Sequence, residues 1–138
     1  MLRYLLDTNV LAEPLAREPD ELLLQRLERY QSQCATAAPV VHEIRYGIEL
    51  LPPSRRQEAY ERYLEEVVLQ LYPVLPYDQR AAARHARERA RQHALGVKRP
   101  YFDGLIAAIA LVNGLVVVTA NVRDFMHYEG LVVESWKR

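Results

Sequence analysis

Apolar positions along the chain follow two patterns, short unbroken runs and longer segments with helical spacing. The runs, each with the length of a β-strand, cover residues 2–6, 34–37, 74–75, 115–118 and 131–133. Between most of them, apolar residues recur every three or four positions, which is typical of amphipathic helices. Strands that alternate with helices favour an α/β fold with a mostly parallel central sheet, in which 115–118 is a central strand and 131–133 an edge strand.

Helix boundaries are marked by residues that cap the first and last turns. Asp20, Ser54 and Asp78 can each accept a hydrogen bond from a backbone N–H at a helix start, and Pro39 is favoured in a first turn. Glycines at the other ends are typical stops. The expected helices therefore cover residues 20–30, 39–51, 54–71, 78–95 and 103–113.

Length and composition narrow the class of protein. The 138 residues are enough for one domain, half of them are hydrophobic, and the formal net charge is zero. The overall charge therefore gives no indication of nucleic-acid binding, and any such binding has to come from local patches or a bound metal. Cys34 is the single cysteine, which excludes an intrachain disulfide and fits a reducing cytoplasm. The longest apolar run, 105–112, is too short to cross a bilayer, so we expect a cytoplasmic protein without a membrane partner.

Acidic residues stand where a parallel sheet binds its ligands, beyond the carboxyl ends of the strands. Asp7 directly follows the first apolar run, and Asp124 follows the fourth run together with Asn121. Asp103 stands in the first turn of an unusually apolar helix, and Glu43 lies beside the apolar stripe of another. Taken singly, each acid has an ordinary interpretation as a turn residue, a helix-start acid or a solvated surface charge.

Taken together, these four acids could converge on one crevice, where like charges repel. A divalent cation removes that conflict, and Mg²⁺ takes a few carboxylates together with water and phosphate oxygens. Such an ion can activate water for attack on a phosphodiester. The histidines show no metal-ligand spacing and are expected at the surface; they are His42, His85, His93 and His127.

Four segments carry a resemblance to a known family. They are Leu5-Leu6-Asp7-Thr8-Asn9-Val10, His42-Glu43-Ile44-Arg45-Tyr46-Gly47, Asp103-Gly104-Leu105-Ile106-Ala107-Ala108 and Thr119-Ala120-Asn121-Val122-Arg123-Asp124-Phe125. Each is weak alone, but their order and spacing resemble those of PIN-domain ribonucleases over nearly the whole chain. The small size and the Glu-Ile-Arg-Tyr-Gly form resemble the VapC toxin branch. One departure is the aromatic pair Tyr101-Phe102 before Asp103, where a more polar lead-in is frequent in the family.

The resemblance implies a single PIN domain over residues 1–138 with a three-layer α/β/α sandwich. It also implies a Mg²⁺-dependent endoribonuclease, in which Mn²⁺ can substitute, that hydrolyses RNA phosphodiester bonds as the toxin of a toxin–antitoxin pair. Carried over by position, the metal-site and catalytic acids are Asp7, Glu43, Asp103 and Asp124. The side chains that support them through hydrogen bonds are Thr8, Asn9, Thr119 and Asn121. The implied partners are the RNA substrate, a VapB-type antitoxin that wraps the region of the helices 20–30 and 54–72, and a second copy of the chain.

A row of arginines leaves two interpretations open. The residues concerned are Arg80, Arg84, Arg87 and Arg91 on one helical face, followed by Lys98 and Arg99. They form either a solvated face neutralised by Glu88 or a track for RNA phosphates that leads to the acids.

Other functions remain as alternatives. A phosphotransfer receiver needs an acidic pair after the first strand, but Asp7 is followed by Thr8 and Asn9. A haloacid-type phosphatase needs a second Asp two residues after Asp7, and Asn9 stands there instead. The more serious alternative is an inactive PIN-fold module that binds RNA or protein. No motif identifies which RNA is bound or cut.

Overall fold

The structure, a computed structural model, describes residues 1–138 and is built on a five-stranded sheet in the order β3-β2-β1-β4-β5. All neighbouring strands pair in parallel. The strands are β1 (Tyr4–Leu6), β2 (Cys34–Ala37), β3 (Val74–Leu75), β4 (Val116–Val118) and β5 (Val133–Glu134). The predicted α/β fold with a parallel sheet is therefore confirmed, with β4 as an interior strand between β1 and the edge strand β5.

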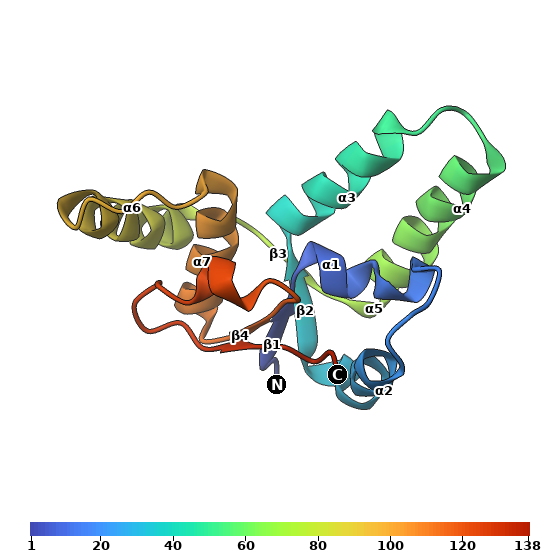
Figure 1. Cartoon of the computed structure of the whole chain (residues 1–138), viewed down its shortest axis with the longest axis horizontal. Coiled ribbons are helices and arrows are strands. Elements are labelled where there is room, and N and C mark those ends of the chain that lie inside the picture. The colour runs from blue at the N-terminus through green and yellow to red at the C-terminus, as the bar shows by residue number, and fades with distance from the viewer.

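Helices cover the sheet and extend to both sides of it (Figure 1). They are α1 (Thr8–Leu11), α2 (Glu21–Tyr30), α3 (Ala38–Leu50), α4 (Arg55–Tyr63), α5 (Leu69–Leu71), α6 (Gln79–Ala94) and α7 (Tyr101–Asn113). Short helical turns span Glu13–Leu15, Gln31–Gln33 and Val122–Phe125, and a π-helical turn spans Leu64–Val68. In Figure 1, α6 and α7 lie to the left of the sheet, while α3 and α4 lie to the upper right. This is the α/β/α architecture expected from the sequence.

The helix caps act as the sequence predicts. Asp20 accepts a hydrogen bond from the N–H of Leu23, and Asp78 accepts one from Ala81. Ser54 caps α4 in the same way, through Gln57. At its carboxyl end, α7 stops at Gly114, which has a φ of 65°. Glycine adopts this left-handed conformation without steric cost, so the helix ends where the sequence places its stop.

Three boundaries differ from the prediction. The helix expected over 54–71 is divided by the π turn, which adds a residue per turn and has no signature in the hydrophobic pattern. Helix α7 begins at Tyr101 and not at Asp103, because the extended Pro100 stands before its first turn. The edge strand β5 lies two residues later than expected, at Val133–Glu134.

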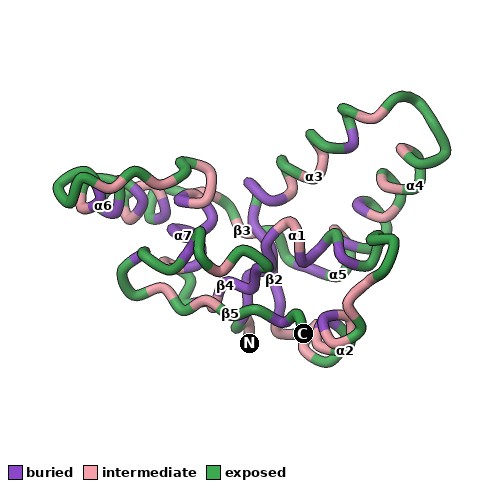
Figure 2. The backbone as a smooth tube through the Cα atoms, viewed as in Figure 1, coloured by how far each residue is buried: buried purple, intermediate pink, exposed green.

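Buried residues concentrate on the strands β1, β2 and β4 and on α7 (Figure 2). The largest fully buried side chains of these elements are Leu5, Leu6, Ile106 and Ile109. Near the amino end of β1, Trp136 packs edge-on against Tyr4 with ring centroids 4.9 Å apart. This aromatic packing leaves the carboxyl ends of the strands free.

Helix α6 packs on α7 through an unusual polar stripe, with Ala81, His85, Glu88 and Gln92 buried at spacings of four, three and four residues. The expectation that His85 lies at the surface is wrong, because its side chain is only 3% exposed. Its Nδ1 lies 2.9 Å from the hydroxyl of Tyr77, which satisfies one ring nitrogen. The other nitrogen lies against Gly104 of α7, where a Cβ atom would overlap it. The close approach of the two helices therefore depends on glycine at position 104.

Replacing Gly104 with alanine should destabilise the protein. The added Cβ would meet the imidazole of His85, which cannot move without breaking its hydrogen bond to Tyr77 or opening the interface between the helices. We expect a decrease of about 1–3 kcal/mol in the free energy of unfolding, typical of an overpacked core, measured by urea denaturation.

Gly47→Ala is the matched control, because Gly47 also lies within a helix but a Cβ atom added there would meet nothing within 4 Å. This change should leave stability unaltered or raise it by about 0.5–1 kcal/mol, since alanine is the better helix former. Equal effects of the two substitutions would contradict the proposed packing constraint.

Candidate active site

Asp7 is the centre of the polar edge of the sheet. It follows β1 directly and caps α1, where its Oδ1 accepts a hydrogen bond of 2.8 Å from the N–H of Thr8. Its side chain is buried although it carries no ion pair in the structure. A buried carboxylate is costly unless hydrogen bonds or a cation compensate it.

Thr119, fully buried after β4, supplies the second hydrogen bond to Asp7. Its hydroxyl donates to Oδ2 at 2.8 Å and accepts a bond from the N–H of Asn121. A further bond joins the same elements, because Oδ1 of Asn9 accepts the N–H of Ala120. Of these predicted supporting residues, Thr119 bonds an acid through its side chain, Asn9 bonds the backbone of Ala120, and Asn121 takes part through its backbone N–H.

Asp103 occupies the first turn of α7 and approaches the same edge. Helix α7 leads into the parallel strand β4, so its first turn lies at the carboxyl end of the sheet (Figure 1). The pKa of Asp103 is raised to about 6, chiefly by burial, and the negative charges of Asp124, Asp7 and Glu43 contribute to the same increase. The four predicted acids are therefore close enough to repel one another.

The pKa of Asp7 is also raised, and burial is the largest cause. Hydrogen bonds from Thr119 and Thr8 lower the pKa, while the charges of Glu43 and Asp124 add to the increase. These last two acids are exposed: Glu43 lies on α3, and Asp124 lies in the turn Val122–Phe125. The site therefore combines two shielded acids with two that face solvent.

The donor set is suited to a hard cation that keeps much of its water. No group of three or more acidic, histidine or cysteine side chains is close enough to enclose a metal ion by itself. Mg²⁺ commonly binds through one or two carboxylates and completes its coordination with water and phosphate oxygens. The hydroxyl of Thr8 is buried next to Asp7 without a hydrogen-bond partner, which leaves an oxygen free for such a shell. The residues present fit this mode and do not fit a zinc site.

Most of the predicted arginine track has structural contacts. Arg80 donates to the carbonyl of Val112. Arg84 and Arg91 both bind the buried Glu88 and also donate to carbonyls of the segment 127–129. Arg87 is exposed and has no such contact. An RNA-binding role of this face stays a prediction, and Lys98 and Arg99 lie apart from it, beside a separate cavity.

Tyr128 is a neighbour of the acids that the sequence did not indicate. Its hydroxyl has its pKa raised to about 12, first by burial and then by the negative charge of Asp103, while Arg99 acts in the opposite direction. The residue therefore lies between Asp103 and a basic region. No local pattern distinguishes it from the other tyrosines, because its position depends on how the loop after β4 folds back.

An apolar groove begins beside the acids, between α1, α3 and α4. It has a volume of 580 Å³ and contains Thr8, Asn9 and Glu43 on its polar side. Its apolar lining includes Leu11, Leu15, Ile44, Ile48, Leu51, Tyr60 and Tyr63. One tyrosine of this set, Tyr63, donates to the carbonyl of Leu11 and so fixes α4 against α1. No helix of the molecule has both the length and the apolar character needed to cross a membrane.

Proteins of known sequence resemble the chain over nearly its whole length. The plasmid stability protein StbB of Pseudomonas syringae is 33% identical, with 96% of this chain and 98% of that protein covered. Toxin FitB of Neisseria gonorrhoeae is 32% identical, with coverages of 96% and 97%. The tRNA(fMet)-specific endonuclease VapC of Salmonella typhimurium is 31% identical, with 99% of both chains covered.

Solved structures agree with this likeness. A chain of FitAB bound to an IR36 DNA fragment superposes with a TM-score of 0.89 at 29% identity, covering 98% of this chain and 96% of that one. A chain of DNA-bound VapBC from Salmonella typhimurium gives 0.86 at 31% identity, with 99% of both covered. The family model described as PIN domain matches residues 4–131. The chain therefore belongs to the PIN domain family.

Proposed function

We propose that this protein is a Mg²⁺-dependent endoribonuclease that acts as the toxin of a toxin–antitoxin pair. The observation that carries the proposal is the convergence of four acids at the carboxyl edge of the sheet, where their charges help to raise the pKa of Asp103 to about 6. The names of the relatives, a toxin and a tRNA-specific endonuclease among them, support the same activity.

The acids divide the work of the reaction by their burial. Asp7 and Asp103 would hold the ion directly, and the exposed Glu43 and Asp124 would complete the acidic edge and act on the ion through water. When bound, Mg²⁺ supplies positive charge that lowers the pKa of water and offsets charge on the phosphate. Thr119 keeps one oxygen of Asp7 fixed through its hydrogen bond, so that the carboxylate is oriented before substrate arrives.

The reaction needs no side-chain nucleophile. Water oriented at the acidic edge attacks the phosphorus of an RNA phosphodiester, and the bond from phosphorus to the leaving ribose oxygen breaks. The protein contributes chiefly by positioning and by its fixed charges. An inactive binding module is the second interpretation of the fold, but such a module would have no use for four acids at one edge, whose charges help to raise the pKa values of Asp7 and Asp103.

Cleavage of RNA should require both metal and the shielded acids. Purified protein incubated with total cellular RNA and Mg²⁺ should give discrete products, and EDTA should abolish them. Asp7→Asn and Asp103→Asn should each lower the cleavage rate about a hundredfold or more, because each removes a charged oxygen donor from the ion.

Circular dichroism shows whether the two variants are folded, and Asp20→Asn is the control. Asp20 is an acid that caps α2 far from the site, and asparagine is also a good cap. A folded wild-type protein that cuts no cellular RNA with Mg²⁺ or Mn²⁺ would favour the inactive binding module. Cleavage that survives both site substitutions would show that the acids are assigned wrongly.

The raised pKa of Asp103 predicts a characteristic pH dependence of stability. An acid whose pKa is higher in the folded than in the unfolded state destabilises the fold once the pH exceeds its ordinary value of 3.8, with the full effect above about 6. Because Asp103 is partly exposed, solvent screening reduces this effect. Asp103→Asn should therefore stabilise the metal-free protein by about 1–2 kcal/mol at pH 7, and this gain should vanish near pH 4.

Thermal unfolding in EDTA, compared between variant and wild type across this pH range, measures the gain. Added Mg²⁺ should stabilise the wild type more than the variant, because binding offsets the repulsion that the asparagine has already removed. A gain in stability that does not change with pH would mean that the pKa of Asp103 is not raised in the folded protein.

We further propose that the cognate antitoxin lies in the apolar groove between α1, α3 and α4. The groove offers apolar side chains to a partner segment and opens at Glu43, so a bound chain could reach the acids. The similar structures FitAB and VapBC are complexes of this kind, which supports a partner of the same class for this chain. The proposed interface therefore includes α4 but not α2.

Leu15→Glu should release the antitoxin, because a charge would enter the apolar lining of the groove. Leu15 is 37% exposed, so the change should not disturb the core. The antitoxin is taken as the protein that relieves growth arrest when co-expressed with this chain, and complex formation is measured by co-purification. The control is Leu95→Glu, at an exposed leucine outside the groove. Retention of the complex by Leu15→Glu would place the antitoxin elsewhere.

A further inference from the structure

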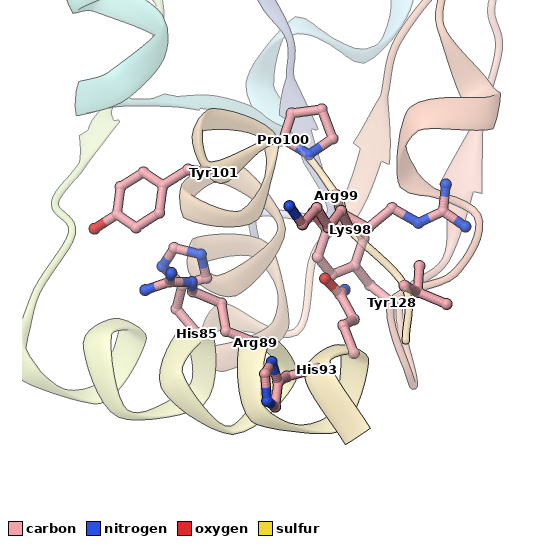
Figure 3. A pocket seen from close by; sticks show the side chains of 10 residues that line it. His85, Arg89, His93, Lys98, Arg99, Pro100, Tyr101 and Tyr128 are labelled. Carbon is pink, nitrogen blue, oxygen red and sulfur yellow. The ribbon is translucent and has the colours of Figure 1, made fainter. Parts of the chain in front are cut away.

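A second cavity, of 310 Å³, lies between α6 and the segment that leads into α7 (Figure 3). Its cationic side chains are Arg89, Lys98 and Arg99, and His85 and His93 also line it. Figure 3 shows His85, Arg89 and His93 arising from α6, with Lys98 and Arg99 on the segment opposite. No acidic residue lines the cavity. In a protein of zero net charge, this is a concentrated region of positive charge.

The cations of this cavity form no ion pairs, in contrast to their neighbours on α6. Arg84 and Arg91 form ion pairs with Glu88, whereas Arg89, Lys98 and Arg99 form none in the structure. The Nε of Arg99 is buried without a hydrogen-bond partner. Free guanidinium and ammonium groups around a concave surface are suited to a phosphate.

An aromatic surface stands beside these cations. The ring of Tyr101 is 56% exposed and lies 5.0 Å from the guanidinium of Arg89. The centroid of the His85 ring lies 5.0 Å from that of the Tyr101 ring, and the two ring planes are tilted by 53°. Single-stranded nucleic acids bind to such combinations, with phosphates on cations and bases stacked on aromatic rings. Phosphate binding alone would not explain a large tyrosine exposed at this mouth.

The cavity adjoins the acidic edge of the sheet. Tyr101 and Asp103 belong to the same first turn of α7, and the cavity wall includes Tyr128, which responds to the charge of Asp103. A strand whose phosphate lies at Asp103 would therefore bring a neighbouring nucleotide to the cavity.

We infer that this cavity is a subsite for one nucleotide of single-stranded RNA, adjacent to the phosphate at the acids. Arg89 and Lys98 receive the backbone phosphate, and the base stacks on Tyr101. The inference rests on the proposed ribonuclease function and adds a determinant of where the strand is held. An acidic peptide would use the cations as well, but it would leave the exposed ring of Tyr101 without a stacking partner.

The test measures binding of a fluorescein-labelled single-stranded oligouridine by anisotropy, in EDTA so that no cleavage occurs, over a range of salt concentrations. The double variant Arg89→Gln/Lys98→Gln should bind more weakly, and the slope of log affinity against log salt should fall by about 0.7 for each phosphate that is no longer neutralised. Arg55→Gln is the control, because Arg55 is an exposed arginine of α4 that lies outside the cavity and outside the predicted arginine track. It should leave the slope almost unchanged.

The stacking interaction has its own pair of variants. Tyr101→Leu should weaken binding about tenfold, whereas Tyr101→Phe, which keeps the ring, should bind as the wild type does. The side chain at this position is exposed, so both variants should keep the fold, and circular dichroism shows whether they do.

The outcomes separate this inference from the proposed function. If the wild type cleaves RNA but the cavity variants keep its affinity and salt slope, the subsite is wrong and the nuclease stands. If the variants lose RNA binding while the wild type cleaves nothing, the subsite stands and the nuclease is wrong. If the variants keep RNA binding but no longer co-purify with the antitoxin, the cavity binds protein and the inference is overturned.

Discussion

The hydrogen bond from Thr119 to Asp7 joins the ends of two neighbouring strands, and the geometry of the acidic edge depends on it. The register of the sheet makes the bond possible, because Leu6 of β1 lies opposite Val118 of β4, so the next residue of each strand meets its counterpart. A shift of one residue would direct both polar side chains to the wrong face. Strand pairing that buries apolar side chains thereby also orients the carboxylate, and stability and site geometry share one cause.

The net charge of the molecule is zero, but its positive and negative side chains gather in separate regions. The zero net charge hides an acidic edge, where the repulsion of like charges helps to raise the pKa of Asp103 to about 6, and a cavity whose cations have no carboxylate partners. Elsewhere on α6, Glu88 forms ion pairs with two arginines, Arg84 and Arg91. The phosphates of an RNA strand can bind the cations directly, but they can approach the acids only through a metal ion. The two regions would therefore bind the same strand in different ways. Net charge alone would have argued against such a ligand.

Local sequence patterns predicted the helices, the strands and the candidate acids, but they did not predict the contacts between helices. The caps at Asp20 and Asp78 and the apolar strands are properties of a few adjacent residues, and Asp7 could be placed because it follows such a strand. The burial of His85 was missed because α6 has no large apolar residues, so its inner face is set by the space that Gly104 leaves on α7. The sequence of α6 shows where its arginines lie, but not which of them form ion pairs or hydrogen bonds in the folded protein.

The aromatic pair before Asp103, where the sequence departs from its family, is explained by the two sides of the first turn of α7. Phe102 is partly buried against the hydrophobic core, and it anchors the turn that presents the acid. Tyr101, one residue earlier, faces the other way and stays exposed beside Arg89. Successive residues of a helix point about 100° apart, so a polar residue at either position would lose either the anchor or the stacking surface. The same turn that fixes the distance of Asp103 from the sheet therefore also fixes the distance between the acids and the basic cavity.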